Sequence, residues 1–116
     1  MAKKRKAPSE YWELKKKYPA YLEAVEALGT AVRQAGPLDG NVTQLVQLGA
    51  AAAIRSEGAV HSHVRRALEA GASADEIRHA IISITSTIGF PNVRAALSWA
   101  DDVLGKARAK RNSATD

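Results

Sequence analysis

Apolar residues recur along most of the chain at intervals of three and four positions, which is the spacing of one face of a helix. This pattern predicts a first helix from Ser9 and a second from Pro19, because proline suits the first turn of a helix. The apolar side chains of the second helix share one stripe: Tyr21, Leu22, Val25, Leu28 and Val32. We expect that helix to end at Gly36, where the chain turns.

A third helix is predicted from about residue 39 to Gly58. It is apolar around much of its circumference, which is typical of a helix buried among others. Because glycine is a common helix stop, Gly58 is expected to separate it from a fourth helix. That fourth helix is predicted to begin near Ala59 and to end at Gly71.

The start of a fifth helix is marked by Ser73 and Glu76, which have the spacing of a capping box. Its body is rich in isoleucine, so a strand is the competing interpretation, but the cap and the length favour one helix that ends at Gly89. The isoleucines fall on more than one face, which indicates an interface with another subunit. A sixth helix follows from Phe90.

Composition supports an all-α fold class, a single-domain bundle of about six helices. The chain has 116 residues, enough for one domain, and only 5% of them are aromatic, while alanine is abundant. Such a composition favours closely packed helices over a sheet. We expect the domain to span residues 9–106, between a disordered basic lead at residues 1–8 and a disordered basic tail at residues 107–116.

The net charge of +5 is concentrated at the two ends of the chain, and the middle is nearly neutral. The basic residues of the ends are Lys3, Lys4, Arg5, Lys6, Lys106, Arg108, Lys110 and Arg111. No aromatic residue interleaves with them to stack on bases, so we do not expect a nucleic-acid partner. No apolar run is long enough to span a membrane, and we expect a cytoplasmic protein that does not contact one.

The chain contains no cysteine and three histidines. It therefore offers no disulfide and no thiolate, whether as nucleophile or as metal ligand. On a helix, His61 and His63 point about 200° apart, so they are not expected to form a joint site. No carboxylate follows His63 at four residues, and we expect neither a metal nor a cofactor.

Three motifs carry a resemblance to a known family. They are GPLD at residues 36–39, HVRRALEAGAS at residues 63–73 followed by an acidic EI start, and the GFP turn at residues 89–91. Together they make residues 36–104 resemble the carboxymuconolactone decarboxylase family, which includes the alkylhydroperoxidase D-like proteins. The resemblance implies an all-helical domain that assembles into homo-oligomers, often trimers or hexamers.

The same resemblance implies where the chemistry of the family's redox-active branch would lie. That branch has a CxxC pair at a helix break, a histidine four residues beyond the second cysteine, and a glutamate one helix earlier. These positions correspond here to Ser56 and Ala59 for the cysteines, His63 for the histidine and Gln44 for the glutamate. A peroxidase of this branch needs one thiolate to attack the peroxide and a second thiol to resolve the sulfenic acid. Thiol peroxidase activity is therefore excluded for the sequence as written.

Three functions stay open at this point. The first is an oligomeric scaffold or small-molecule-binding protein with a degenerate, cysteine-free redox site. The second is a decarboxylase-type lyase for a small keto or lactone acid, in which His63 acts as acid or base and an arginine anchors the carboxylate. The candidate anchors are Arg55, Arg65, Arg66 and Arg94. The third is an alkylhydroperoxidase-type antioxidant function, which would apply if cysteines had been removed by engineering.

Overall fold

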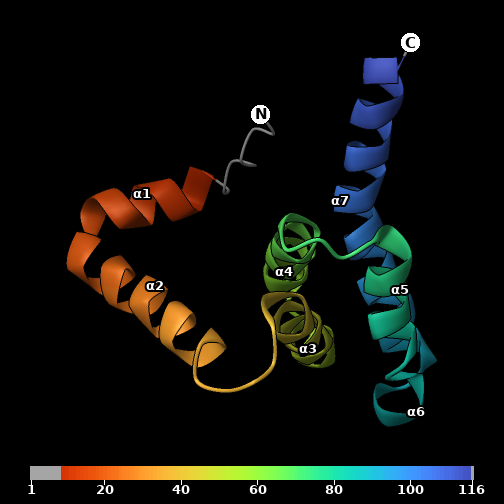
Figure 1. Cartoon of the computed structure of the whole chain (residues 1–116), viewed down its shortest axis with the longest axis horizontal. Coiled ribbons are helices and arrows are strands. Elements are labelled where there is room, and N and C mark those ends of the chain that lie inside the picture. The colour runs from red at the N-terminus through yellow and green to blue at the C-terminus, as the bar shows by residue number, and fades with distance from the viewer. Residues whose placement is uncertain (1–8, 116) are drawn as a thin grey trace. The chain divides into compact units, whose positions relative to one another are not determined.

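The computed structural model describes the backbone of residues 9–115 and the side chains of residues 9–105. Across residues 9–115 every regular element is a helix, from α1 to α7, which confirms the all-α fold class (Figure 1). The predicted lead, residues 1–8, and the side chains of the predicted tail, residues 107–116, lie outside this description, so the domain limits stay predictions. Contacts divide the chain into two units, residues 1–39 and 40–116.

The first unit contains α1 (Ser9–Lys17) and α2 (Pro19–Arg33). Pro19 occupies the first turn of α2, as predicted, and α2 ends before Gly36. An ion pair joins the two helices, since Lys15 Nζ lies 3.0 Å from Glu26 Oε1. The hydrogen bond from the ammonium to Glu26 raises the pKa of Lys15 above its ordinary value.

The apolar stripe of α2 is not covered within the first unit. Leu22 is the one residue of α2 that is buried. The other members of the stripe are all exposed: Tyr21, Val25, Leu28 and Val32. Steps of three and four residues place them along one side of the helix. The first unit therefore presents a continuous apolar surface.

The second unit contains five helices: α3 (Gly40–Ala53), α4 (Glu57–Glu69), α5 (Ala74–Ile82), α6 (Thr85–Ile88) and α7 (Phe90–Thr115). α3 packs against α4 and α5, and α7 packs against α4, α5 and α6. The largest fully buried side chains make up the centre of this unit: Leu48, Val60, Val64, Ile77, Ile81 and Val93. Buried alanines between them let the helices approach closely, as the alanine-rich composition predicts.

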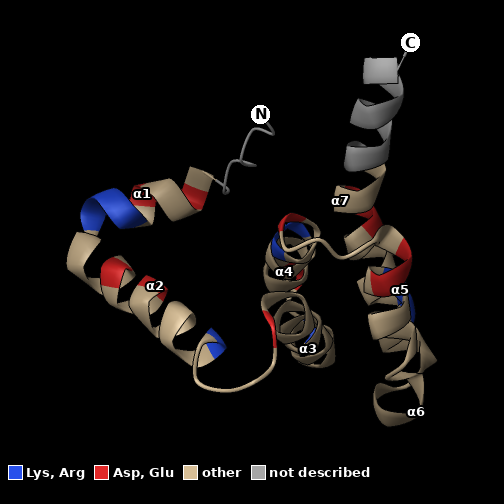
Figure 2. Ribbon diagram, viewed as in Figure 1, with Lys and Arg blue, Asp and Glu red and all other residues tan. Residues whose placement is uncertain are grey.

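α3 carries no charged residue from Gly40 to Ala53 (Figure 2). One face is buried in the core, as expected, but the opposite side exposes Val42 and Val46, the latter to 60%. This helix therefore has an apolar face that the second unit leaves uncovered. No helix within residues 9–115 is long and apolar enough to cross a membrane.

The boundary between α3 and α4 differs from the prediction. α3 ends at Ala53, and the backbone reverses at Arg55, which has a φ of 57°. Ser56 then caps α4, accepting a hydrogen bond from the Ala59 N–H at 3.3 Å. The predicted stop at Gly58 is wrong, because Gly58 lies inside the first turn of α4. A left-handed residue other than glycine costs about 1–2 kcal/mol, and here the Arg55 guanidinium is tied to Asn92 Oδ1 of α7.

The capping box that begins α5 is confirmed. Ser73 Oγ accepts from the Glu76 N–H at 3.0 Å, and Glu76 Oε1 accepts from the Ser73 N–H at 2.8 Å. The prediction of one helix as far as Gly89 is wrong, because α5 ends at Ile82 and α6 begins at Thr85. At this break the Ser83 hydroxyl donates to the Ala80 carbonyl oxygen at 2.8 Å, and such hydroxyls compete with helical hydrogen bonding.

The isoleucines between residues 77 and 88 are mostly buried in the core of the second unit or packed against it. Ile77 and Ile81 are fully buried, and Ile84 and Ile88 pack against the core while partly buried. Among these isoleucines, Ile82 is the exposed one, at 50%. The expectation that the isoleucines form an interface is therefore weakened, and the exposed stripe of α2 is the stronger indication of one.

Two neighbouring aspartates of α7 connect it to two other helices. Successive residues of a helix point about 100° apart, so Asp101 and Asp102 face different neighbours. Asp101 Oδ1 accepts from Arg78 Nη2 of α5 at 3.1 Å. Asp102 Oδ2 lies 2.9 Å from His61 Nε2 of α4. These polar contacts supplement the apolar packing of α7.

Candidate functional site

The four positions implied by the family resemblance lie around the junction of α3 and α4. Gln44 lies in the second turn of α3. Ser56 immediately precedes α4, and Ala59 and His63 lie one turn apart within it. The left-handed Arg55 turns the chain between the two helices. The break between the two helices is therefore located next to the positions where the family places its reactive groups.

Gln44 and His63 form a hydrogen bond across this junction. Their atoms Oε1 and Nδ1 lie 3.0 Å apart. An amide oxygen only accepts hydrogen bonds, so the Nδ1–H of His63 is the donor. In the neutral ring the lone pair then resides on Nε2. The contact thus fixes both the tautomer and the orientation of the imidazole.

Gln44 is the one buried polar residue among the described side chains, with 5% of its surface exposed. Burial of an amide is unfavourable unless the amide is hydrogen-bonded, and His63 supplies a partner for its oxygen. A carboxylate at this position could carry a proton, whereas the amide cannot. Gln44 therefore orients His63 without taking part in proton transfer.

Ser56 and Ala59 have structural roles at the two positions implied for cysteines. The Ser56 hydroxyl oxygen accepts the Ala59 N–H and so satisfies one of the unpaired donors at the start of α4. Ala59 is partly buried and packs against the core. Neither side chain can form the thiolate that peroxide reduction requires.

His61 belongs to a different surface from His63. It contacts Asp102 of α7, whereas His63 contacts Gln44 of α3, which agrees with the separation expected from their spacing. Glu57, one turn earlier in α4, also lies close to His61 and Asp102. Sequence reasoning missed this group, because Glu57 precedes the residue at which the helix was expected to begin. The spacing of four residues between Glu57 and His61 was the available signal.

The four arginines considered as carboxylate anchors differ in their contacts and in their exposure. Arg55 donates to Asn92 and so braces the helix junction. Arg66 and Arg94 are exposed, and Arg65 is partly buried.

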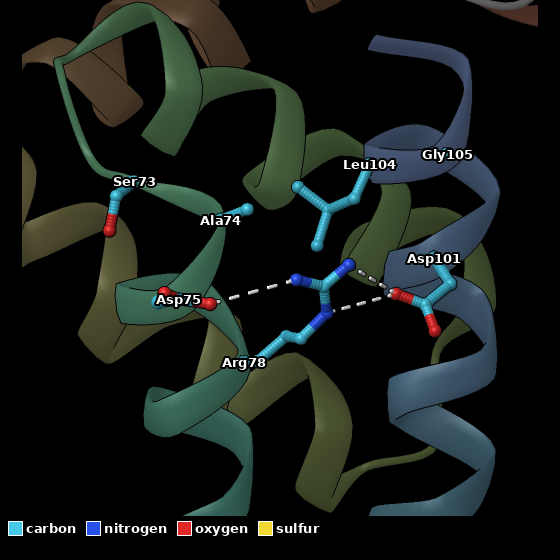
Figure 3. Close-up of a pocket in the computed structure, with 7 residues that line it drawn as sticks. All are labelled: Ser73, Ala74, Asp75, Arg78, Asp101, Leu104 and Gly105. Carbon is cyan, nitrogen blue, oxygen red and sulfur yellow. Dashed lines mark hydrogen bonds and ion pairs between the residues drawn. The ribbon is translucent and has the colours of Figure 1, made fainter. Parts of the chain in front are cut away.

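A pocket of about 510 Å³ lies between α5 and α7 (Figure 3). Its lining residues are Ser73, Ala74, Asp75, Arg78, Asp101, Leu104 and Gly105. The guanidinium of Arg78 lies between two carboxylates, 3.1 Å from that of Asp101 and 3.9 Å from that of Asp75. Its charge is thus locally balanced, which does not favour an anionic ligand. The pocket shares no residue with the Gln44–His63 pair.

Comparison with known proteins identifies relatives of the chain. The model of the carboxymuconolactone decarboxylase family matches residues 19–102, a range that includes all four positions. An uncharacterised protein of Haemophilus influenzae is 37% identical over 57 residues, which are 49% of this chain and 50% of that protein. The chain thus spans about half the length of this curated relative. No solved structure matches.

The hydrogen bond between Gln44 and His63 can be measured with a double-mutant cycle. Gln44→Met and His63→Leu each remove one partner of the hydrogen bond and put an apolar side chain in its place. Because a net hydrogen bond contributes about 0.5–1.5 kcal/mol, we expect a coupling energy of that size in urea unfolding. Gln44→Met combined with His79→Ala is the control, since His79 is exposed on α5. A coupling no larger than that of the control pair would contradict the bond.

Proposed function

The chain belongs to the carboxymuconolactone decarboxylase family, and from this premise we propose that it is a homo-oligomeric small-molecule-binding or scaffold protein without thiol peroxidase activity. The observation that carries the proposal is the hydrogen-bonded pair of Gln44 and His63 next to the capping Ser56. The family framework is thus retained while each reactive group but the imidazole is replaced.

The replaced positions support loss of redox chemistry for a physical reason. A hydroxyl that accepts the hydrogen bond of a helix cap contributes to folding, and at neutral pH it is far less nucleophilic than a thiolate. Ala59 has no group that could resolve an oxidised partner. Gln44 holds the imidazole in place but cannot relay a proton. What survives is a fixed imidazole, which can bind a polar ligand or act alone.

Assembly into a homo-oligomer, a trimer or a hexamer, is supported by the apolar side chains that the first unit leaves exposed on α2. These are Tyr21, Val25, Leu28 and Val32. A contiguous apolar stripe of this kind is typical of a surface that another subunit covers. The proposal retains the expected cytoplasmic location and includes neither a nucleic-acid nor a membrane partner.

A lyase acting on a small keto or lactone acid is the second candidate, favoured by the tautomer of His63. With Nδ1–H donated to Gln44, the lone pair of the neutral ring is located on Nε2. Decarboxylation needs a donor that protonates the carbanion or enolate left by carbon dioxide, and an imidazolium formed at Nε2 can supply that proton. The carboxylate of the substrate would need a cationic anchor, for which Arg66, three residues beyond His63 on the same face of α4, is the best placed in sequence.

The oligomer should depend on the stripe of α2. We expect wild-type protein at micromolar concentration to elute as at least a trimer in size-exclusion chromatography with light scattering. Leu28→Glu places a charge in the stripe and should shift the mass toward the monomer, because burial of an unpaired charge is costly. Glu23→Gln, on another side of α2, is the matched control and should leave the mass unchanged. A monomeric wild-type protein would contradict the proposal.

Activity assays distinguish the two candidate functions. With hydrogen peroxide and a dithiol reductant, wild-type protein should consume no more peroxide than the reductant alone. With carboxymuconolactone and related β- or γ-keto acids, the wild-type protein should release no carbon dioxide, whether or not it binds these acids. Release that His63→Ala abolishes and His79→Ala preserves would instead establish the lyase. Peroxide turnover by the wild-type protein would overturn both.

A further inference from the structure

Three side chains that can ligate a metal converge on the surface between α4 and α7. Glu57 and His61 lie four residues apart on α4, hence on one face of the helix, and Asp102 comes from α7. One ligand atom from each lies within 4.8 Å of the others. His61 Nε2 and Asp102 Oδ2 are separated by 2.9 Å. We infer that these residues form a binding site for a divalent transition-metal ion, with Zn²⁺ as the metal that fits them best.

The type of ligands favours zinc over harder cations. Zn²⁺ accepts imidazole nitrogen and carboxylate oxygen at about 2.0–2.2 Å, whereas Mg²⁺ prefers oxygen ligands and retains several waters. In a tetrahedral shell with such bonds, neighbouring ligand atoms lie roughly 3.4 Å apart. The three side chains therefore require only small rotations to surround one ion. Water completes the shell, because Glu57 and Asp102 are exposed.

The charges of the cluster also call for a cation. Two carboxylates that approach within a few ångströms repel each other unless a positive charge lies between them. A divalent metal ion between the two carboxylates would supply such a charge, and its two positive charges would match their two negative ones.

The helices hold the ligands in position from both sides. α4 packs directly against α7, and buried side chains of both helices belong to the same core. His61 is mostly shielded, with 27% of its side chain exposed. A metal ion here would link the two helices and stabilise the second unit. The site uses neither Gln44 nor His63, so it does not depend on the proposed function.

Titration of the full-length, tag-free protein with ZnCl₂ in a calorimeter tests this site. We expect saturable binding of one ion per chain, a melting temperature that rises with Zn²⁺, and much weaker binding of Mg²⁺. Loss of a residue that merely supports a metal ligand costs about 10- to 100-fold in affinity, so His61→Ala should weaken Zn²⁺ binding by at least about tenfold. Asp102→Asn and Glu57→Gln should also weaken it.

His79→Ala is the matched control, because it removes an exposed histidine outside the cluster. Its affinity for Zn²⁺ should equal that of the wild type. Circular dichroism shows whether each variant is folded. If His61→Ala does not fold, the exposed and nearly isosteric Asp102→Asn and Glu57→Gln variants test the site in its place. Absence of Zn²⁺ binding, or binding that the cluster variants leave unchanged or that His79→Ala weakens equally, would overturn the inference.

Discussion

The reversal of the backbone at Arg55 determines the arrangement on which the candidate site depends. A left-handed residue ends α3 at once, and the serine that follows caps α4, so the two helices pack against each other after a very short connection. This packing brings Gln44 of α3 within hydrogen-bonding distance of His63 of α4. The unfavourable conformation at Arg55 is offset by its contact with Asn92, which couples the junction to α7.

The sequence was informative where a local rule decides the structure. The capping box at Ser73 and the proline at the start of α2 depend on adjacent residues, and both were predicted correctly. The predicted helix end at Gly58 was wrong because glycine is only the commonest residue at a helix end. Here the left-handed residue is Arg55, which a tertiary contact stabilises. The break after Ile82 depends on the balance between side-chain and backbone hydrogen bonds, which periodicity does not encode.

The same distinction applies to the candidate functional residues. Family resemblance indicated Gln44, Ser56, Ala59 and His63, but it could not indicate that Gln44 bonds to His63 or that Ser56 acts as a cap. The group of Glu57, His61 and Asp102 was not predictable from spacing alone, because one of its members comes from α7. His61 and His63, two residues apart on one helix, thus make separate polar contacts, since the helix directs them toward different neighbours.

We propose that the junction of α3 and α4 is the framework of a redox site from which the reactive groups are missing. Reintroducing them is the most direct test: Gln44→Glu, Ser56→Cys and Ala59→Cys are combined in one variant, and reduction of hydrogen peroxide by a dithiol is measured. This triple variant should gain peroxide turnover over the wild type, and His63→Ala in the same background should remove it. A folded triple variant with both thiols reduced and no more activity than the wild type would contradict the account.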